Sequence, residues 1–385
     1  MKEDHYGALT GPMPRWDSES WLRLALAGPV SLQTLARLAE CCAEPAGLAT
    51  CRADQLIRAG LSEAAARVFL EPGPGLDTAR TWLEHAENTL LTLASPDYPP
   101  LLRQIADPPV VLFARGRPEI LRLPQLAMVG SRNPTPAGET TARRFARHFA
   151  SRGLAITSGL ATGIDAASHI GALEADGFTV AVCATGLDQV YPSVNQQLAE
   201  RIAQQGVLVS EFPLGTPPRR HHFPLRNRII SGISVGTLVV EAARRSGSLI
   251  TARAALEQGR EVLAIPGSIH NPLARGCHSL IRAGAKLVET ADDVVEEIAP
   301  LVGAQLESAD EAQDNAATPT ETLDSDYTKL LDAMGFDPVD QDTLTQRSGL
   351  TTAEVSSMLL ILELKGVVVA APGGLFYRTD STGNS

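Results

Sequence analysis

Two arginines separated by one asparagine, and followed at once by apolar residues, stand in the middle of the chain. The run covers residues 223–232 and contains Arg226, Asn227 and Arg228. A run of this kind places its charged groups on an element whose other side is buried. Guanidinium groups donate paired hydrogen bonds that match the oxygens of a phosphate. The run therefore predicts a site for a phosphate-bearing ligand.

Three further loops carry small, polar or cationic residues, each close to the end of a stretch that reads as a buried strand. Glycine admits close backbone approach, serine offers a hydroxyl, and the free N–H groups of a helix start attract anions. Loops that follow parallel strands meet at one edge of the sheet, where open α/β folds bind ligands. We therefore expect these loops to join the 223–232 run in one site. The candidate binding residues are Gly130, Ser131, Arg132, Ser158, Gly159, Phe223, Arg226, Asn227, Arg228 and Ser248.

The elements that must position these loops form a regular series. Short apolar stretches of strand length alternate with helix-length segments over most of the region from residue 126 to residue 289. This alternation predicts an α/β fold with a mostly parallel sheet and helices on both faces. The predicted strands are 110–113, 126–129, 154–157, 179–183, 207–212, 237–242, 261–265 and 286–289.

The segment before this series is predicted to be helical. Asp17, Ser31 and Ser62 each precede an apolar-periodic stretch and are suited to cap a helix. Short helices parted by glycine and proline indicate a small bundle of the SAM or helix–hairpin–helix kind, and a further helix is expected at 77–90. Such bundles either contact DNA or only pack, and the scarcity of Lys and Arg favours packing or protein contact.

The segment after the series predicts a linker and a second small domain. Residues 300–325 are rich in Ala, Glu, Asp and Thr, which indicates a flexible acidic linker. Helices at 327–334, 342–349 and 351–365, followed by a hairpin at 366–378, predict a winged helix. Its expected recognition helix holds Lys365 as its only Lys or Arg, so protein contact is favoured over DNA contact, and both remain open. The predicted domains are 1–90, 91–299, 300–325 and 326–380.

Charge is distributed unevenly along the chain. The net charge is -11, yet residues 213–286 hold eleven Lys and Arg against three acids, and residues 287–326 hold twelve acids and no Lys or Arg. The asymmetry indicates a basic functional face beside an acidic segment. The alternative is that the two segments neutralise each other.

Several classes of protein are disfavoured. The chain has no apolar run of the roughly 20 residues that a membrane helix needs, and we expect no signal peptide. Five cysteines form no CxxC pair, so we expect reduced thiols, no metal and a cytoplasmic location. Neither G-x-G-x-x-G after the first strand nor G-x-x-x-x-G-K-[ST] is present, which argues against a dinucleotide cofactor and a P-loop NTPase. We expect no cofactor.

Two residues could carry catalysis. Glu241 ends an apolar strand and could be a base, or could hold Arg226, Arg228 or Arg244; the structural role is favoured. His169 follows Asp165 by four residues on a predicted helix. That spacing is more typical of capping and packing than of catalysis.

Eight motifs, in order, make the region from about residue 98 to 297 similar to the DNA processing protein A family (DprA, also called Smf). The resemblance implies an extended Rossmann-like core that binds single-stranded DNA without sequence preference and without turnover. It also implies a dimer that protects incoming strands in natural transformation and loads the RecA recombinase onto them. By position, the resemblance assigns Arg132, Arg226, Asn227 and Arg228 to the DNA pocket, and Tyr191 joins Phe223 as a candidate stacking ring. The motifs are residues 130–132, 158–169, 185–192, 210–215, 223–231, 240–242, 246–248 and 264–267.

Two rival functions remain. A nucleotide phosphoribohydrolase shares this general sheet, but its Pro-Gly-Gly run is absent before Gly236 and Thr237. The second rival function is that of an adaptor, which would bind only proteins through its flanking domains.

Overall fold

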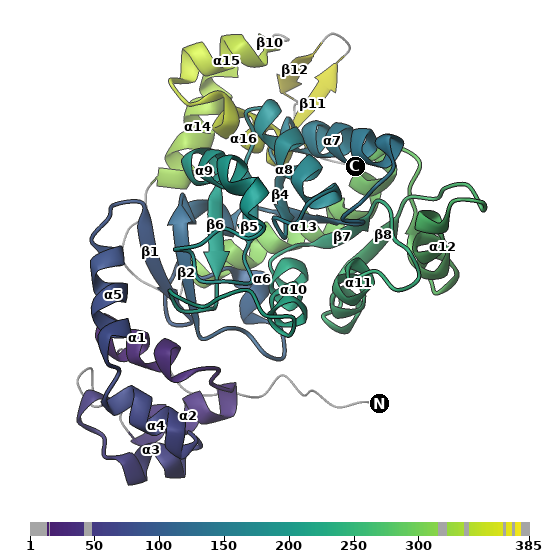
Figure 1. Cartoon of the computed structure of the whole chain (residues 1–385). Coiled ribbons are helices and arrows are strands. Elements are labelled where there is room, and N and C mark those ends of the chain that lie inside the picture. Colours follow the sequence, from purple (N-terminus) through teal and green to yellow (C-terminus); the bar gives the residue numbers. More distant parts are fainter. Residues whose placement is uncertain are drawn as a thin grey trace, which may run out of the picture.

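The structure is a computed structural model that describes residues 14, 16–41, 48–314, 322–334, 339–364, 367–371 and 374–378. It contains a helical N-terminal unit, a large α/β core and a small winged-helix unit (Figure 1). Among the described residues, no helix combines the length and apolar character that crossing a membrane requires.

The N-terminal unit consists of short capped helices, as the sequence predicts. Asp17 accepts the Ser20 N–H, Ser31 accepts the Thr34 N–H and Ser62 accepts the Ala65 N–H. These oxygens satisfy N–H groups that have no partner within a helix. The helices are α1 (Ser18–Ala27), α2 (Leu32–Cys41), α3 (Ala53–Ala59), α4 (Glu63–Leu70) and α5 (Pro74–Leu83).

Two expectations for this region are wrong in part. The helix expected at 77–90 ends at Leu83, and β1 (Asn88–Thr92) follows it and pairs with β2 (Val111–Gly116). The residues of β1 form a strand by pairing with β2, which lies later in the chain, so the local sequence alone did not predict it. Cys51 is disulfide-bonded, so the expectation of reduced thiols fails at this position.

The core is one nine-stranded sheet in the order β1-β2-β6-β5-β4-β3-β7-β8-β9 (Figure 1). The strands from β6 to β9 are parallel, and β2 pairs antiparallel with both β1 and β6. The chain order reverses at β3, whose neighbours are β4 and β7. Ligands of open α/β sheets bind at such a switch point. The remaining core strands are β3 (Gln125–Val129), β4 (Ala155–Ser158), β5 (Thr179–Val182), β6 (Val207–Ser210), β7 (Gly236–Val239), β8 (Glu261–Ala264) and β9 (Lys286–Leu287).

Alternate residues of the central strands face two apolar layers. Leu126 and Met128 of β3 pack with α7, α8 and α13, whereas Ala127 and Val129 pack with α10 and α11. Burial on both faces explains why these strands read as continuous apolar stretches. The core helices are α6 (Pro100–Arg103), α7 (Pro136–Ala150), α8 (Ile164–Glu174), α9 (Gln196–Gln205), α10 (His222–Gly232), α11 (Ser248–Glu257), α12 (Arg275–Arg282) and α13 (Ala291–Asp314).

One buried histidine joins a helix to the sheet. His169 of α8 is fully buried, and its Nδ1 lies 2.7 Å from the Thr179 hydroxyl of β5. The same hydroxyl donates to the Ile156 carbonyl oxygen of β4. His169 therefore packs rather than faces a ligand, as its spacing from Asp165 predicts.

The segment predicted as a flexible acidic linker is helical in its first part. Helix α13 runs to Asp314 and so includes residues 300–314. It begins with Asp292 and Asp293 in its first turn, which favours a helix start, and it buries Val294, Ile298 and Val302 on the core. Because residues 300–325 contain few large apolar residues, the sequence did not predict a helix there. A single row of apolar residues is enough to hold α13 on the core. Residues 315–321 lie outside the described residues.

The C-terminal unit has the winged-helix elements that the sequence predicts, with one additional short strand. Thr351 and Glu354 form a capping box at the start of α16, because Thr351 donates its N–H to Glu354 and accepts the Glu354 N–H. Its elements are α14 (Thr322–Met334), β10 (Val339–Asp340), α15 (Gln341–Ser348), α16 (Thr352–Leu364), β11 (Val368–Ala371) and β12 (Leu375–Arg378).

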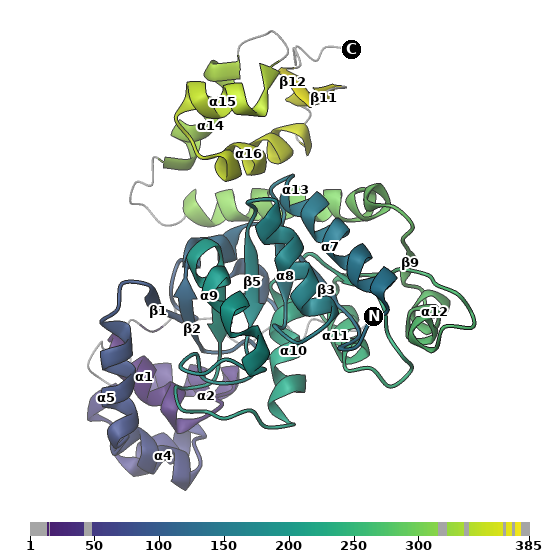
Figure 2. The ribbon, with the colours of Figure 1, turned by 45° about the horizontal axis from the view of Figure 1, so that its top comes forward.

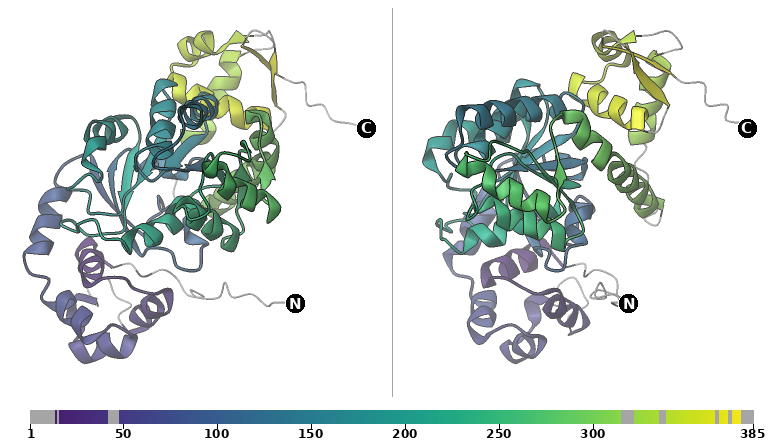
Figure 3. Two further views of the ribbon diagram at one scale, coloured as in Figure 1. Left: turned by 45° about the vertical axis from the view of Figure 1, so that its right-hand side comes forward. Right: turned by 90° about the vertical axis from the view of Figure 1, so that its right-hand side faces the viewer.

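Helix α16, the expected recognition helix, is covered on two sides. Val355 and Leu359 pack inside the winged-helix unit, while Leu360 packs against the core. Ser357 lies against Gly153 of the core, and its hydroxyl donates to the Gly153 carbonyl oxygen at 3.4 Å. The winged-helix unit lies beside α13 and α7, away from the N-terminal helices (Figure 2, Figure 3).

Gly153 is required where the two units meet. Its φ is +84°, and an added Cβ would lie 2.2 Å from the Ser357 Cα. We expect Gly153→Val to separate the winged-helix unit from the core and to increase the radius of gyration in small-angle X-ray scattering. Gly284→Val is the matched control, because Gly284 has φ +107° but nothing within 4 Å of an added Cβ. Equal radii for the two variants would contradict this docking.

His169 gives the core a pH dependence. Burial lowers the pKa of His169 to about 3, against roughly 6.5 in an unfolded chain. Between these values the unfolded chain binds the extra proton, so the free energy of unfolding falls as the pH falls. Relative to wild type, we expect His169→Gln to remove up to about 1.4 kcal/mol of this loss per pH unit, measured by urea unfolding at several pH values below neutrality. The exposed His270→Gln is the control, and parallel profiles for wild type and His169→Gln would contradict the assignment.

Candidate functional site

A cavity of about 670 Å³ opens at the carboxyl ends of β3 and β7, where the strand order reverses. We call it the switch-point pocket. Its walls are the loop 130–132 after β3, helix α10, and the loop 243–247 with the start of α11. Helices α10 and α11 lie side by side beneath the sheet (Figure 1). The structure thus brings the run 223–232 to the edge predicted from the sequence.

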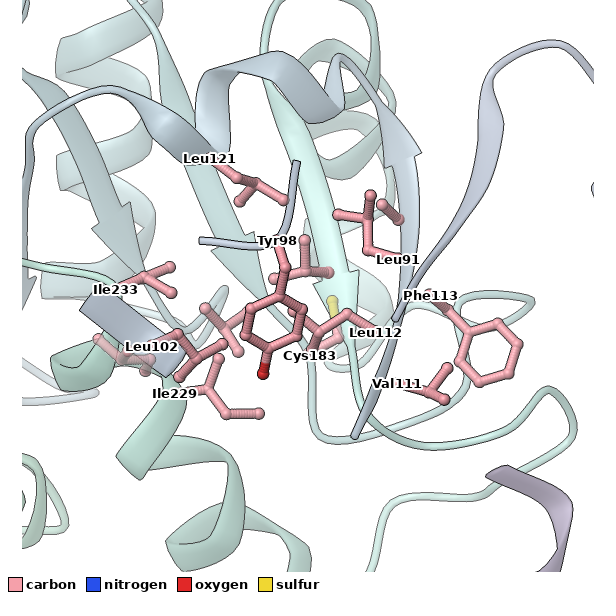
Figure 4. Packing of buried hydrophobic residues seen from close by; sticks show 14 of the residues in the cluster. Leu91, Tyr98, Leu102, Val111, Leu112, Phe113, Leu121, Cys183, Ile229 and Ile233 are labelled. Atoms are coloured by element: carbon pink, nitrogen blue, oxygen red, sulfur yellow. The ribbon is translucent and has the colours of Figure 1, made fainter. Parts of the chain in front are cut away.

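Helix α10 is held in place by its apolar side. Ile229 and Ile233 pack into a cluster with Tyr98 and Leu102 (Figure 4). The Tyr98 hydroxyl donates to the Pro109 carbonyl oxygen at 2.6 Å, which satisfies the one polar atom of that buried ring. Residues on the other sides of α10 therefore face their surroundings in a fixed orientation.

Seven of the ten sequence-predicted residues line the switch-point pocket. Ser248 begins α11, and its hydroxyl lies 2.6 Å from that of Ser246, which also accepts the Ser248 N–H. Ser131 accepts the Asn133 N–H within its own loop. The lining residues from the prediction are Gly130, Ser131, Arg132, Phe223, Arg226, Asn227 and Ser248.

Ser158 and Gly159 lie behind the pocket rather than in its lining. The Ser158 hydroxyl donates to the Met128 carbonyl oxygen at 2.6 Å and is fully buried. The N–H groups of Gly159 and Ala161 donate to Asp165. The free amides expected to meet an anion at this loop are therefore occupied by a side chain of the protein.

Gly159 instead makes room for an arginine. A Cβ at position 159 would lie 1.6 Å from Nη1 of Arg226, far closer than two non-bonded atoms can approach. The glycine therefore allows the guanidinium group to lie against the backbone of the β4–α8 loop. Its role is steric clearance, which differs from the direct phosphate contact that the sequence suggested.

Arg226 is the unusual group of the pocket. It is 4% exposed, and its Nε and Nη1 have no hydrogen-bond partner. Within the described part of the chain, no carboxylate forms an ion pair with it. Burial lowers the pKa of Arg226, and the charge of Asp165 opposes this shift. A guanidinium group stays protonated at any physiological pH, so the pocket carries a buried positive charge with two unpaired donors.

Asp165 supplies part of the counter-charge. It is buried beside Gly159, and burial raises the pKa of its carboxyl group, while Arg226 and the two amide donors oppose that shift. The Asp165 carboxylate accepts hydrogen bonds from the loop backbone, and it attracts Arg226 electrostatically without an ion pair. A second negative group, brought by a ligand, is therefore still favourable at Arg226.

Further arginines surround the pocket mouth. Arg132 and Arg220 line it, and Arg244 and Arg245 stand exposed on the loop 243–247. Where the structure describes the chain, none of these four side chains has an ion-pair partner. The sequence analysis counted Arg220, Arg244 and Arg245 in the basic segment but did not propose them as binding residues. Their only signal was the excess of Lys and Arg over residues 213–286.

Two aromatic rings stand at the same mouth. The Tyr191 and Phe223 ring centroids are 5.9 Å apart at 58°, and the Arg132 guanidinium lies 5.3 Å from the Phe223 centroid. Tyr191 is 46% exposed, so one face of the pair is open. Both candidates that the sequence offered for stacking are thus adjacent to the arginines.

Arg228 does not line the switch-point pocket. It points from another side of α10 toward Glu211, at 2.7 Å, and Asp107, at 3.3 Å. Two residues along a helix from Arg226 correspond to about 200° of rotation. The helical geometry therefore separates two arginines that look equivalent in the sequence.

Glu241 has the structural role that the sequence favoured, but with a different partner. Its carboxylate accepts the N–H of Thr135 at 2.9 Å and the hydroxyl of Thr135 at 2.7 Å. Thr135 in turn caps α7 by accepting the Gly138 N–H. None of the three arginines considered in the sequence is its partner. Both carboxylate oxygens are occupied, which leaves Glu241 poorly placed to act as a base.

Comparisons with known proteins agree with this geometry. The family model described as DNA recombination-mediator protein A matches residues 89–299, and a second, described as the DprA winged helix domain, matches residues 314–374. The protein Smf of Escherichia coli (strain K12) is 41% identical over 362 residues, which cover 93% of this chain and 95% of that protein. The DNA processing protein DprA of Bacillus subtilis (strain 168) is 46% identical over 216 residues, or 56% of this chain and 72% of that protein.

Two solved structures are also similar. DNA processing protein A from Streptococcus pneumoniae aligns with a TM-score of 0.64 and 36% identity, covering 74% of this chain and 99% of that structure. DNA processing protein A from Helicobacter pylori, described as binding single-stranded DNA, aligns with a TM-score of 0.51 and 27% identity over 55% of this chain and 96% of that structure. The extent of these matches, taken with the fold and the pocket, shows that the chain belongs to the DprA/Smf family of DNA processing proteins.

Proposed function

We propose that the chain binds single-stranded DNA in the switch-point pocket, mainly through phosphate groups. The observation that carries the proposal is the buried guanidinium of Arg226, which has two unpaired nitrogens and no ion-pair partner among the described residues. Burying a charge is costly unless a partner compensates it. A phosphate group in the pocket supplies the missing negative charge.

Single strands suit the pocket better than duplex. Tyr191 and Phe223 offer ring faces beside the arginines, and stacking on them requires a base whose own face is free. In a duplex those faces are covered by neighbouring base pairs. The single-stranded DNA described for the Helicobacter pylori protein supports the same ligand.

Binding of this kind has no sequence preference. Phosphate contacts carry no base information, and ring stacking tolerates every base. The winged-helix unit, which would be the other candidate for reading DNA, has α16 packed against the core at Gly153. It is proposed to serve contacts with proteins rather than with DNA.

The protein is proposed to act by binding and not by turnover. Burial keeps His169 neutral behind the sheet, and Glu241 is occupied by Thr135. The arginines, serines and aromatic rings at the pocket mouth position phosphates well but are not general bases. The carboxylate of Asp165, which also lines the pocket, already accepts the N–H groups of Gly159 and Ala161. The phosphoribohydrolase alternative would need such a base, and release of free base from nucleoside monophosphates would support it.

The wider role follows from the family. We propose that the chain protects single strands during natural transformation, loads the RecA recombinase onto them, acts as a homodimer and works in the cytoplasm. The membership of the family and the names of its relatives support these proposals. Light scattering of the full chain, with and without oligonucleotide, tests the dimer.

Arg226→Ala is expected to weaken binding of a labelled oligothymidylate at least tenfold, because loss of a hydrogen bond to a charged group costs roughly 1.5–3 kcal/mol. Fluorescence anisotropy measures the affinity. Gly159→Ala should weaken binding as well, since its Cβ displaces Arg226 without removing any charge. Arg201→Ala, an exposed arginine of α9 outside the pocket, is the control for loss of one positive charge. Equal affinity of Arg226→Ala and wild type would move the site elsewhere.

Salt dependence counts the phosphate contacts. If all five arginines of the site contact phosphate, the slope of log K against log salt is about −3.5, since each contact to a single strand contributes about −0.7. A rise from about 50 to 200 mM salt then weakens binding on the order of a hundredfold. A slope near zero would contradict phosphate binding. The five arginines are Arg132, Arg220, Arg226, Arg244 and Arg245.

A further inference from the structure

A second cavity, of about 570 Å³, lies where the N-terminal helices meet the core. We call it the seam pocket. Its walls are the turn 28–31 after α1, the segment 107–111 before β2, the loop 211–213 after β6, and helix α10. None of the functions described above uses this cavity.

Helix α10, with the two residues before it, is a wall shared by both cavities. Arg220, Phe223, Arg226 and Asn227 line the switch-point pocket, whereas His221, His222, Leu225 and Arg228 line the seam pocket. The crest between them is open to solvent, because Arg220, His221, Pro224 and Leu225 are exposed. A helix with its side chains is about 10–12 Å across. The two cavities are therefore close enough for a few nucleotides of one strand to reach both.

Charge differs sharply between the two cavities. In the seam pocket, the carboxylates of Asp107 and Glu211 both pair with Arg228, so its acids outnumber its arginine. In the switch-point pocket, Arg132, Arg220 and Arg226 face Asp165. A phosphate is attracted to the switch-point pocket and repelled from the seam pocket. An uncharged group is what the seam pocket accepts.

Rings and prolines line the seam pocket beside these charges. The Phe212 and His222 rings are stacked, with centroids 4.2 Å apart at 23°, and His221 stands edge-on to His222 at 4.5 Å. The loop that carries Phe212 is held by its N–H, which donates to Ser210, and Nδ1 of His222 lies 3.2 Å from the Ala184 carbonyl oxygen. Fixed aromatic surfaces of this kind are platforms for planar bases.

We propose that the seam pocket binds a nucleobase of the same single strand whose phosphates lie in the switch-point pocket. The strand crosses the exposed crest of α10, with its backbone on the basic side and a base on the aromatic, acidic side. This inference rests on the proposed function of the switch-point pocket. It assigns the N-terminal helical unit a role in DNA binding, because the turn 28–31 forms one wall of the base site.

The test separates bases from phosphates. Fluorescence anisotropy compares oligothymidylate with an abasic oligonucleotide of equal length, which keeps every phosphate and lacks every base. Two full-length variants alter the seam pocket, the half-buried Phe212→Ala and the exposed Leu225→Ala. Leu256→Ala is the matched control, since this leucine of α11 is 54% exposed and lines neither cavity.

We expect Phe212→Ala to weaken binding of oligothymidylate roughly five- to hundredfold, as removal of one stacking side chain does. Leu225→Ala should weaken it by a smaller factor. Neither variant should change binding of the abasic oligonucleotide, and Leu256→Ala should match wild type on both ligands.

Each other outcome has a distinct meaning. If Phe212→Ala and Leu225→Ala bind oligothymidylate as wild type does while Arg226→Ala does not, the base site is wrong and the phosphate site stands. Equal losses on both oligonucleotides would also overturn the base site, because the effect would not depend on a base. If Arg226→Ala binds both ligands like wild type, the proposed function itself fails.

Discussion

The site depends on one buried positive charge that the protein leaves largely uncompensated. Arg226 is almost fully buried, and Gly159 provides the space that its guanidinium group needs. Isolated charges in a protein interior are costly, so such a group persists where a ligand completes it or where the surrounding packing holds it. Here the packing comes from α10, whose isoleucines anchor the helix in the core. The same helix therefore carries residues that stabilise the core and residues of the proposed binding site.

The same helix explains why neighbouring residues have different fates. Arg226 and Arg228 differ by two positions, which turns their side chains to different sides of α10. One faces a pocket without an ion-pair partner, and the other is paired with Asp107 and Glu211. This division makes α10 the wall between an arginine-rich cavity and a cavity in which acids outnumber the arginine.

The winged-helix unit shows a second consequence of packing. Helix α16 is buried over most of its length, because one side completes the core of its own unit and another lies against Gly153 and the core, while Thr352, Glu354 and Glu363 stay exposed. The sequence already suggested that this helix lacks the polar side chains of a DNA reader. Its docking adds that Ser357 and Leu360 are covered by the core.

Local patterns in the sequence determined the parallel sheet, the capped N-terminal helices, the winged helix and most residues of the pocket. Strand periodicity, caps and glycine-rich loops act over a few residues, so they can be read without tertiary contacts. The sequence also favoured a structural role for Glu241. It did not predict the partner, because Thr135 lies more than a hundred positions away in the chain.

Only the tertiary structure decided which way each side chain faces and what it meets. It placed Ser158 and Gly159 behind the pocket, paired Arg228 with two acids, extended α13 through residue 314 and paired β1 with β2. It also created the seam pocket from four segments distant in the chain. These features arise from contacts between remote residues, and such contacts depend on the register and rotation of whole elements, which no short stretch of sequence encodes.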